Sequence, residues 1–224
     1  MPVYFTKDIC TFLKDLGNHN DREWFNQNKN QFKEYVEKPF IIFVNDLIET
    51  FKELDPRIQI TSKEAIFRIY KDIRFSQDKT PYKEFVSALI SPGGRKDRSS
   101  PGFYFEIRQD AIHIYSGVYE PDPKQLLKIR LYIASHAKDF SKLLLDPKFV
   151  KRFGKILGEK NKVLPKELKE AAALQALIFN KNFYFMCSLD PELLYSTKLI
   201  EEFVNAFIDA RALNVFFEKA LNSE

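Results

Sequence analysis

The chain has few of the residues that build metal sites and disulfide frameworks. Its 224 residues include only two cysteines and three histidines. Cys10 and Cys187 lie far apart, and the histidines have no close spacing, so the ligand pattern of a zinc site is missing. We therefore predict no metal site, and the sequence indicates no particular cofactor. One long-range disulfide is an alternative, but reduced thiols in a cytoplasmic protein are the simpler expectation.

Long apolar runs are also missing. The longest candidates, such as residues 40–44, fall far short of the roughly 20 residues that span a bilayer. The N-terminus has charged residues in its first turns and no apolar signal core, which argues against secretion and a membrane location. The dinucleotide-binding glycine fingerprint, the P-loop, the nucleophile elbow and the zinc-protease helix motif do not occur. No common enzyme class is therefore indicated by a motif.

Positive charge is concentrated in one part of the chain. The formal net charge is only +4, yet residues 124–182 contain 14 lysines and arginines against 5 acidic residues. A basic block of this kind attracts nucleic acid or another polyanion when its charges share one surface. Here the lysines are dispersed through amphipathic sequence, which is typical of solvated helix faces. Nucleic-acid binding through this block is the less favoured interpretation.

The hydrophobic pattern predicts an α+β fold. Apolar residues make up 45% of the chain and include 22 phenylalanines, enough for a substantial core. The spacing is helical up to about residue 62, has a two-residue period as far as about residue 122, and is then largely helical again. We predict a central antiparallel sheet of about four to five strands, flanked by N-terminal and C-terminal helices. The expected strands are residues 66–75, 85–91, 102–109, 112–116 and 182–189. The chain is expected to form a single domain, 1–224, with sub-lobes 1–121 and 122–224 as an alternative.

Three helices are expected before the sheet. The first is a short helix that Thr6 could cap and that Gly17 would end. Asn20, followed three residues later by Glu23, resembles a capping box and predicts a helix from Asp21 toward Glu37. Pro39 suits the first turn of a separate helix that ends near Leu54.

The segment with the densest group of polar side chains is residues 66–82, I-F-R-I-Y-K-D-I-R-F-S-Q-D-K-T-P-Y. A strand period divides it into two faces. The apolar face has Phe67, Ile69, Ile73 and Phe75, with Lys71 among them. The polar face has Arg68, Tyr70, Asp72, Arg74 and Ser76. We expect one concave region with at least one direct contact between an aspartate and an arginine, shared by Arg68, Asp72, Arg74, Lys79 and Tyr82.

Such a cluster predicts either an anion site or a structural ion-pair ladder. Arginine presents a planar fork that matches phosphate and carboxylate, and Asp72 could orient one of these forks. Paired charges on a sheet could equally be structural, since burying such pairs is often near neutral for stability. The candidate ligand-binding residues are Arg68, Lys71, Asp72, Arg74, Lys79 and Tyr82.

The hairpin expected at residues 102–116 could add acid–base groups. Glu106 shares one side of its strand with Tyr104 and Arg108, and His113 shares one side of the next strand with Tyr115. If these sides coincide with that of Arg68, Glu106 and His113 become available for proton transfer. The candidate catalytic residues are Asp72, Glu106 and His113. A magnesium ion held by Asp72, Asp78 and Glu106 together with a bound phosphate is conceivable on donor chemistry, but no spacing specifies it.

Two motifs resemble a known family. The bacterial and fungal domain-of-unknown-function family 2461 has a signature close to R-x-x-R-D-x-R-F-x-x-x-K-x-x-Y. Here it is matched by Arg68, Lys71, Asp72, Arg74, Phe75, Lys79 and Tyr82, with lysine at position 71 where the family usually has arginine. Residues 18–25, N-H-N-D-R-E-W-F, resemble the family's opening, and Gly117 and Pro121 match a later glycine–proline stretch.

The resemblance implies that the motif matters to family members, and it implies no activity. Two functions are therefore compatible with the sequence. The first is binding of, or catalysis on, a phosphorylated or otherwise anionic small molecule at the motif. The second is a non-catalytic interaction module whose cationic surface holds an acidic protein or nucleic acid. The sequence does not specify an oligomeric state.

Overall fold

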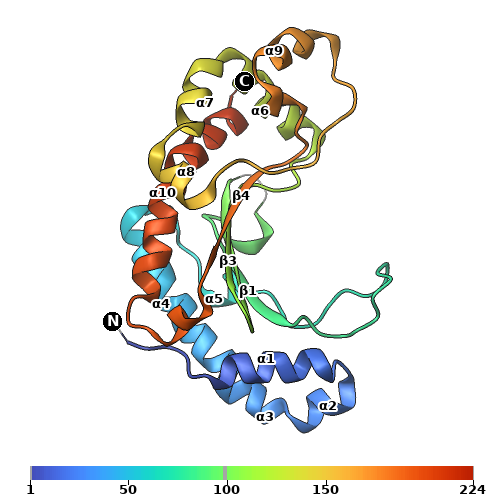
Figure 1. Ribbon diagram of the computed structural model, residues 1–224, viewed down its shortest axis with the longest axis vertical. Helices are drawn as coiled ribbons and strands as arrows, with labels where there is room; N and C mark the ends of the chain where they lie inside the picture. The colour runs from blue at the N-terminus through green and yellow to red at the C-terminus, as the bar shows by residue number, and fades with distance from the viewer. Residues whose placement is uncertain (1, 98–99, 224) are drawn as a thin grey trace. The chain divides into compact units, whose positions relative to one another are not determined.

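The computed structural model describes residues 2–97 and 100–223 and has an α+β fold, as predicted. Its antiparallel sheet has four strands in the order β1-β2-β3-β4 (Figure 1). Their bounds are Phe85–Ile90, Gly102–Arg108, Ile112–Val118 and Phe183–Leu189. These agree with four of the five expected strands. Within the described ranges no helix is both long and apolar enough to cross a membrane. Cys10 and Cys187 are not joined by a disulfide, so that alternative is wrong.

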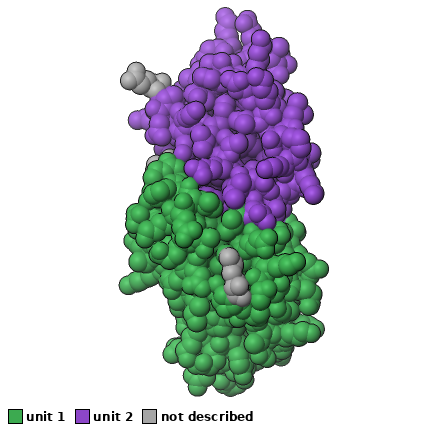
Figure 2. All heavy atoms as spheres, turned by 90° about the vertical axis from the view of Figure 1, so that its left-hand side faces the viewer, with its two compact units in different colours: residues 1–96, 104–114, 188–204 green, residues 97–103, 115–187, 205–224 purple. Residues whose placement is uncertain are grey.

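The chain divides into two compact units (Figure 2). Unit 1 contains residues 1–96, 104–114 and 188–204, and unit 2 contains residues 97–103, 115–187 and 205–224. Strands β2, β3 and β4 and helix α10 (Leu199–Leu221) therefore contribute residues to both units. The single domain expected from the sequence stays a prediction.

Unit 1 is built around a cluster of phenylalanine rings. Phe43 contacts Phe5, Phe105 and Phe203 edge-on, with ring centroids 5.6, 5.8 and 5.2 Å away. Such edge-to-face pairs stabilise a core beyond the burial of their area. They join the N-terminal segment, α4 (Lys38–Leu54), β2 and α10 within this unit. The helices of unit 1 that precede the sheet are α1 (Asp8–Asn18), α2 (Arg22–Gln27), α3 (Lys29–Gln31), a π-helical turn (Phe32–Glu37), α4 (Lys38–Leu54) and α5 (Ser62–Ala65).

The expected break at Pro39 does not occur. The π-helical turn runs directly into α4, and its last hydrogen bond joins the Lys38 N–H to the Lys33 carbonyl. A proline inside an α-helix removes one hydrogen bond and clashes with the carbonyl four residues earlier. The wider π-turn changes the hydrogen-bond spacing just before Pro39, which lets the helix continue through it. The interruption lies instead at Asn28, between α2 and α3.

Unit 2 is mainly helical. The rings of Phe140 and Phe216 stack with centroids 4.9 Å apart, and Phe217 packs on Phe183 of β4 at 5.7 Å. The unit also contains a backbone approach that only glycine permits: Gly117 has φ +103°, and a Cβ there would lie 2.3 Å from the Phe183 carbonyl oxygen. Its helices are α6 (Pro123–Ser135), α7 (Ala137–Leu144), α8 (Pro147–Phe153), α9 (Lys169–Leu174) and the later part of α10, with 3-10 turns at Lys166–Leu168 and Ala176–Phe179.

The strand expected at residues 66–75 is wrong. Only two isolated bridges form, between Ile66 and Ala88 and between Tyr70 and Tyr82. Residues 66–83 instead make an irregular hairpin beside β1, named the arm below (Figure 1). Aspartate side chains explain the irregularity, because they accept hydrogen bonds from nearby backbone N–H groups and so compete with a sheet ladder.

Candidate functional site

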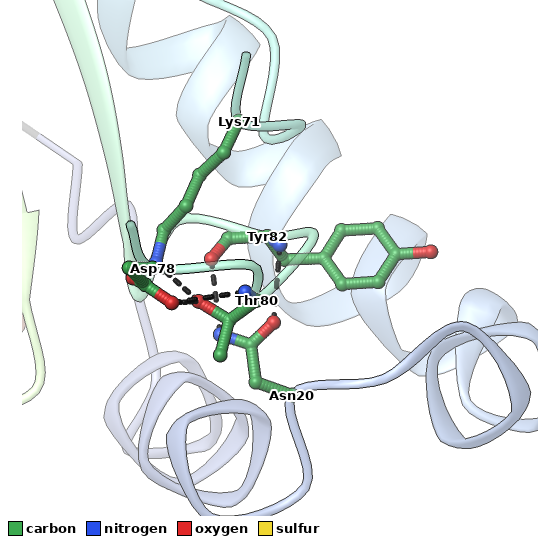
Figure 3. A network of polar contacts seen from close by, with 5 residues as sticks. All are labelled: Asn20, Lys71, Asp78, Thr80 and Tyr82. Atoms are coloured by element: carbon green, nitrogen blue, oxygen red, sulfur yellow. Dashed lines mark hydrogen bonds and ion pairs between the residues drawn. The ribbon is translucent and has the colours of Figure 1, made fainter. Parts of the chain in front are cut away.

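Asn20 fastens the arm to the N-terminal helices of unit 1. Its amide nitrogen donates to the Tyr82 carbonyl and its amide oxygen accepts from the Tyr82 N–H, both at 3.0 Å (Figure 3). The two backbone groups of Tyr82 are therefore satisfied by one side chain, as a neighbouring strand would satisfy them. The predicted capping box at Asn20 is wrong, since Asp21 caps α2 by accepting from the Trp24 N–H. Asn20 instead connects the two sequence motifs.

Aromatic rings reinforce this attachment. Tyr82 is only 2% exposed and stacks on Phe25 of α2 with ring centroids 4.1 Å apart. Tyr70, on the opposite branch of the arm, packs 5.2 Å from Tyr82 and 6.2 Å from Phe25. The Tyr82 ring points away from the polar side chains of the arm (Figure 3). Of the predicted ligand-binding residues, it is the one that lies in the packed interior.

Lys71 is engaged within the arm itself. Its ammonium donates to Asp78 at 2.8 Å and to the Thr80 hydroxyl at 2.6 Å (Figure 3). Asp78 also accepts from the N–H and the hydroxyl of Thr80. These contacts, above all the one with Lys71, hold the pKa of Asp78 well below its usual range. The network joins the outgoing branch of the arm to the returning one.

Asp72 and Arg74 form the predicted contact between an aspartate and an arginine. The Arg74 Nε and Nη2 donate to the two Asp72 carboxylate oxygens at 2.9 and 2.7 Å. These hydrogen bonds, with a smaller contribution from the charge of Arg68, lower the pKa of Asp72 to about 2. The side chains of Arg74 and Asp72 are 77% and 48% exposed, and Arg68 is also exposed. The arm thus presents two guanidinium groups whose charges act on one carboxylate.

Lys79 lies at an open hollow of about 780 Å³. Its ammonium donates to the Ile73 carbonyl at 3.1 Å, which positions the side chain and leaves N–H groups for another acceptor. The hollow is lined by residues of both sequence motifs. They include the cations Arg22 and Lys79 and the acidic residues Asp21, Glu23 and Asp78. Lys79 therefore lies at the open hollow, whereas Tyr82 is buried and does not line it.

Replacing Arg74 with alanine is expected to raise the pKa of Asp72 from about 2 toward the ordinary aspartate value of about 3.9. Because the folded pKa lies below the unfolded one, the contact adds stability above about pH 4, and that stability is lost as the pH falls through about 2. An NMR titration of the Asp72 carboxyl carbon in wild type and variant measures the shift. An unchanged titration would show that the fork does not form in solution.

A second group of polar side chains lies on the sheet face that the core does not cover. In β2 the core face has Phe105 and Ile107, whereas Tyr104, Glu106 and Arg108 alternate with them. The Tyr104 hydroxyl donates to Glu106 at 2.7 Å, and Arg108 binds the same carboxylate through Nε and Nη2. Glu106 is 7% exposed, so this carboxylate is both buried and paired.

The hairpin register places two catalytic candidates on one face. The Arg108 N–H donates to the Ala111 carbonyl, which sets Glu106 opposite His113 on the neighbouring strand. This open face meets the base of the arm, where the Lys83 ammonium lies 5.2 Å from the centre of the Phe67 ring. Lys83 was missed in the sequence, although it alternates with Phe85 and Ser87 and so belongs to the same face.

No cluster of three metal-ligating side chains occurs among residues 2–97 and 100–223. Asp72, Asp78 and Glu106 are each occupied by a different cation, Arg74, Lys71 and Arg108 respectively. The groups considered for magnesium are thus engaged in separate ion pairs.

A comparison with protein families confirms the family resemblance. A family model described as a conserved hypothetical protein, DUF2461, matches residues 8–216. A search of curated proteins found no match. The matched range contains both Asn20 and the whole arm. The chain therefore belongs to the DUF2461 family of conserved hypothetical proteins.

Proposed function

We propose that this protein binds the anionic group of a small molecule through the cations of the arm. The observation that carries the proposal is the Asp72–Arg74 fork with Arg68 in electrostatic range of the same carboxylate. Asp72 holds the Arg74 guanidinium in a fixed orientation, while most of that side chain stays exposed. A preoriented guanidinium loses little conformational freedom when it binds phosphate or carboxylate.

Lys79 supports the same ligand chemistry. Its anchoring to the Ile73 carbonyl keeps a positive charge over the open hollow. In this proposal Arg68, Arg74 and Lys79 contact the anion and Asp72 orients Arg74. Lys71 maintains the shape of the arm through Asp78 and Thr80, and Tyr82 anchors it.

The proposal is for binding and assigns no reaction. A carboxylate with a pKa of about 2 is a weak general base and is not protonated at neutral pH, so Asp72 fits an orienting role better than a catalytic one. Glu106 is already bound by Tyr104 and Arg108.

Inorganic phosphate and simple nucleotides are expected to bind with a salt-sensitive affinity, measured by calorimetric titration. Arg74→Lys and Arg68→Ala should each weaken binding about tenfold or more, because each loses charge-assisted hydrogen bonds worth about 1.5–3 kcal/mol. Arg74→Lys keeps the charge and removes the fork, so it separates geometry from charge.

Lys151→Ala serves as the control, since Lys151 is an exposed lysine of α8 in the basic block. It should leave the affinity unchanged. Equal weakening by Lys151→Ala would indicate diffuse electrostatic attraction and favour the interaction module. If wild type binds none of these anions at millimolar concentration, the proposal is to be dropped.

Phe75 favours a second candidate, the interaction module. Its side chain is 95% exposed although the sequence placed it on the apolar face of a strand. The Arg74 guanidinium lies 6.0 Å from the ring centre. An exposed aromatic ring among cations is the combination that binds single-stranded nucleic acid. Fluorescence anisotropy with a labelled single-stranded oligonucleotide tests this candidate: Phe75→Ala should weaken oligonucleotide binding and leave phosphate binding unchanged.

A further inference from the structure

Lys83 is a half-buried cation without a direct partner. Its ammonium lies between two phenylalanine rings, 5.2 Å from the centre of Phe67 and 5.8 Å from that of Phe85. In the described part of the chain no hydrogen-bond acceptor or carboxylate lies within bonding distance of it. Ring faces attract a cation, but more weakly than a desolvated carboxylate does. The position therefore costs hydration that the neighbouring side chains do not fully replace.

The surrounding charges leave an excess of positive charge. Glu106 is the carboxylate that acts on Lys83, yet its oxygens are occupied by the Tyr104 hydroxyl and the Arg108 guanidinium. Arg68 adds a further positive charge whose field reaches Lys83. Desolvation first, and then Arg68, lower the pKa of Lys83, while Glu106 opposes the shift. An oxyanion beside Lys83 would offset this excess of positive charge.

We propose that Lys83 and Arg108 bind the carboxylate or phosphate group of a small molecule on the open face of the sheet. Both cations lie at the Phe85 ring, with the Arg108 guanidinium carbon 4.3 Å from its centre. The Arg108 side chain is 35% exposed, which leaves it accessible while Glu106 fixes its orientation. This inference rests on the proposed function, because the charge of Arg68, one of the proposed anion-binding cations of the arm, also acts on Lys83.

The site at Lys83 is also partly apolar, because aromatic rings lie beside the ammonium. Phe67 and Tyr104 pack edge-on at 5.8 Å, so aromatic rings border the Lys83 ammonium. His113 lies opposite Glu106 in the hairpin register, on the same face. The rings exclude part of the water, which strengthens the attraction between the ammonium and an oxyanion. A small oxyanion with an apolar remainder fits this surface.

Lys83→Met distinguishes a binding lysine from a structural one. Methionine keeps an unbranched side chain between the two rings but removes the charge. If Lys83 binds an anion, the variant should bind phosphate at least tenfold more weakly in calorimetric titration. It should also unfold at the same temperature as wild type or a higher one, since an uncompensated charge has been removed. Lys14→Met, on an exposed face of α1, is the matched control and should change neither property.

A measurement on the wild-type chain avoids dependence on any variant. An NMR titration of the Lys83 Cε resonance, with and without saturating inorganic phosphate, reports the pKa of the amine directly. Bound phosphate stabilises the ammonium, so the pKa should rise when phosphate is present. The same titration with acetate separates carboxylate from phosphate recognition.

The outcomes separate this inference from the function on which it rests. Wild-type affinity in Lys83→Met, or an unchanged Lys83 pKa in phosphate, overturns the Lys83 site. If Arg74→Lys and Arg68→Ala still weaken binding in that case, the proposed function stands. A complete lack of anion binding by the wild type overturns both.

Discussion

Asn20→Ala is expected to lower the free energy of unfolding by about 2–4 kcal/mol, because it leaves two buried backbone groups without partners. The Asn20 amide satisfies both the N–H and the carbonyl of Tyr82, a residue that is 2% exposed. Without these bonds the arm loses its polar attachment and keeps only the Phe25–Tyr82 stack. Anion affinity should fall as well, since Arg68, Arg74 and Lys79 would be held less firmly.

Asn28→Ala is the matched control for this prediction. Asn28 follows the same N-terminal motif by three residues, but its side chain makes one local hydrogen bond, to the Trp24 carbonyl. Its removal should cost about 1 kcal/mol and leave anion binding unchanged. Urea denaturation followed by circular dichroism gives both values. If both variants lose the same free energy of unfolding, the hydrogen bonds of Asn20 to Tyr82 contribute no more than the single local bond of Asn28.

Gly117→Ala is expected to cause the largest loss, about 4–5 kcal/mol, at the upper end of single substitutions. Two penalties combine at this position. The backbone has φ +103°, which side-chain-bearing residues rarely adopt, and the new Cβ would lie 2.3 Å from the Phe183 carbonyl oxygen. The clash is with the backbone of β4, so a rotamer change cannot relieve it.

Gly154→Ala separates the two penalties. Gly154 also has a positive φ, +73°, but a Cβ added there would meet nothing within 4 Å. Only backbone strain should be felt at this position, at about 1–3 kcal/mol. Thermal unfolding of both variants measures the difference. Equal destabilisation would show that β4 shifts to accommodate the methyl group at Gly117 without cost.

The strands that follow a two-residue alternation were predictable, and the arm was not. In β2 the alternation of Phe105 and Ile107 with Glu106 and Arg108 reflects one buried and one open face. The arm begins with the same alternation, yet Asp72 and Asp78 bind nearby backbone groups and end it. A pattern of hydrophobicity does not contain this local competition between side chain and backbone.

The contacts that hold the arm and position Lys83 could not be predicted from the sequence pattern either. The partner of Asn20 lies 62 residues away, and Asp21 beside it took the capping role that Asn20 was expected to have. The pairing of Asp72 with Arg74 was predictable because the two residues are close in sequence. The setting of Lys83 depends on Glu106 and Arg68, which reach it only through the fold.

Because unit 1 is built from three separate stretches of the chain, it cannot fold completely as soon as its first stretch has been synthesised. Phe203 packs on Phe43 and Phe105, so the aromatic core of unit 1 includes a residue that follows most of unit 2 in the sequence. As the chain leaves the ribosome, the segments that contain Asn20 and Phe43 emerge well before Phe203. Domains generally fold as units, and an N-terminal unit usually folds first. Here the core of unit 1 cannot close until Phe203 has been synthesised, so its phenylalanines stay exposed while residues 115–187 of unit 2 are made.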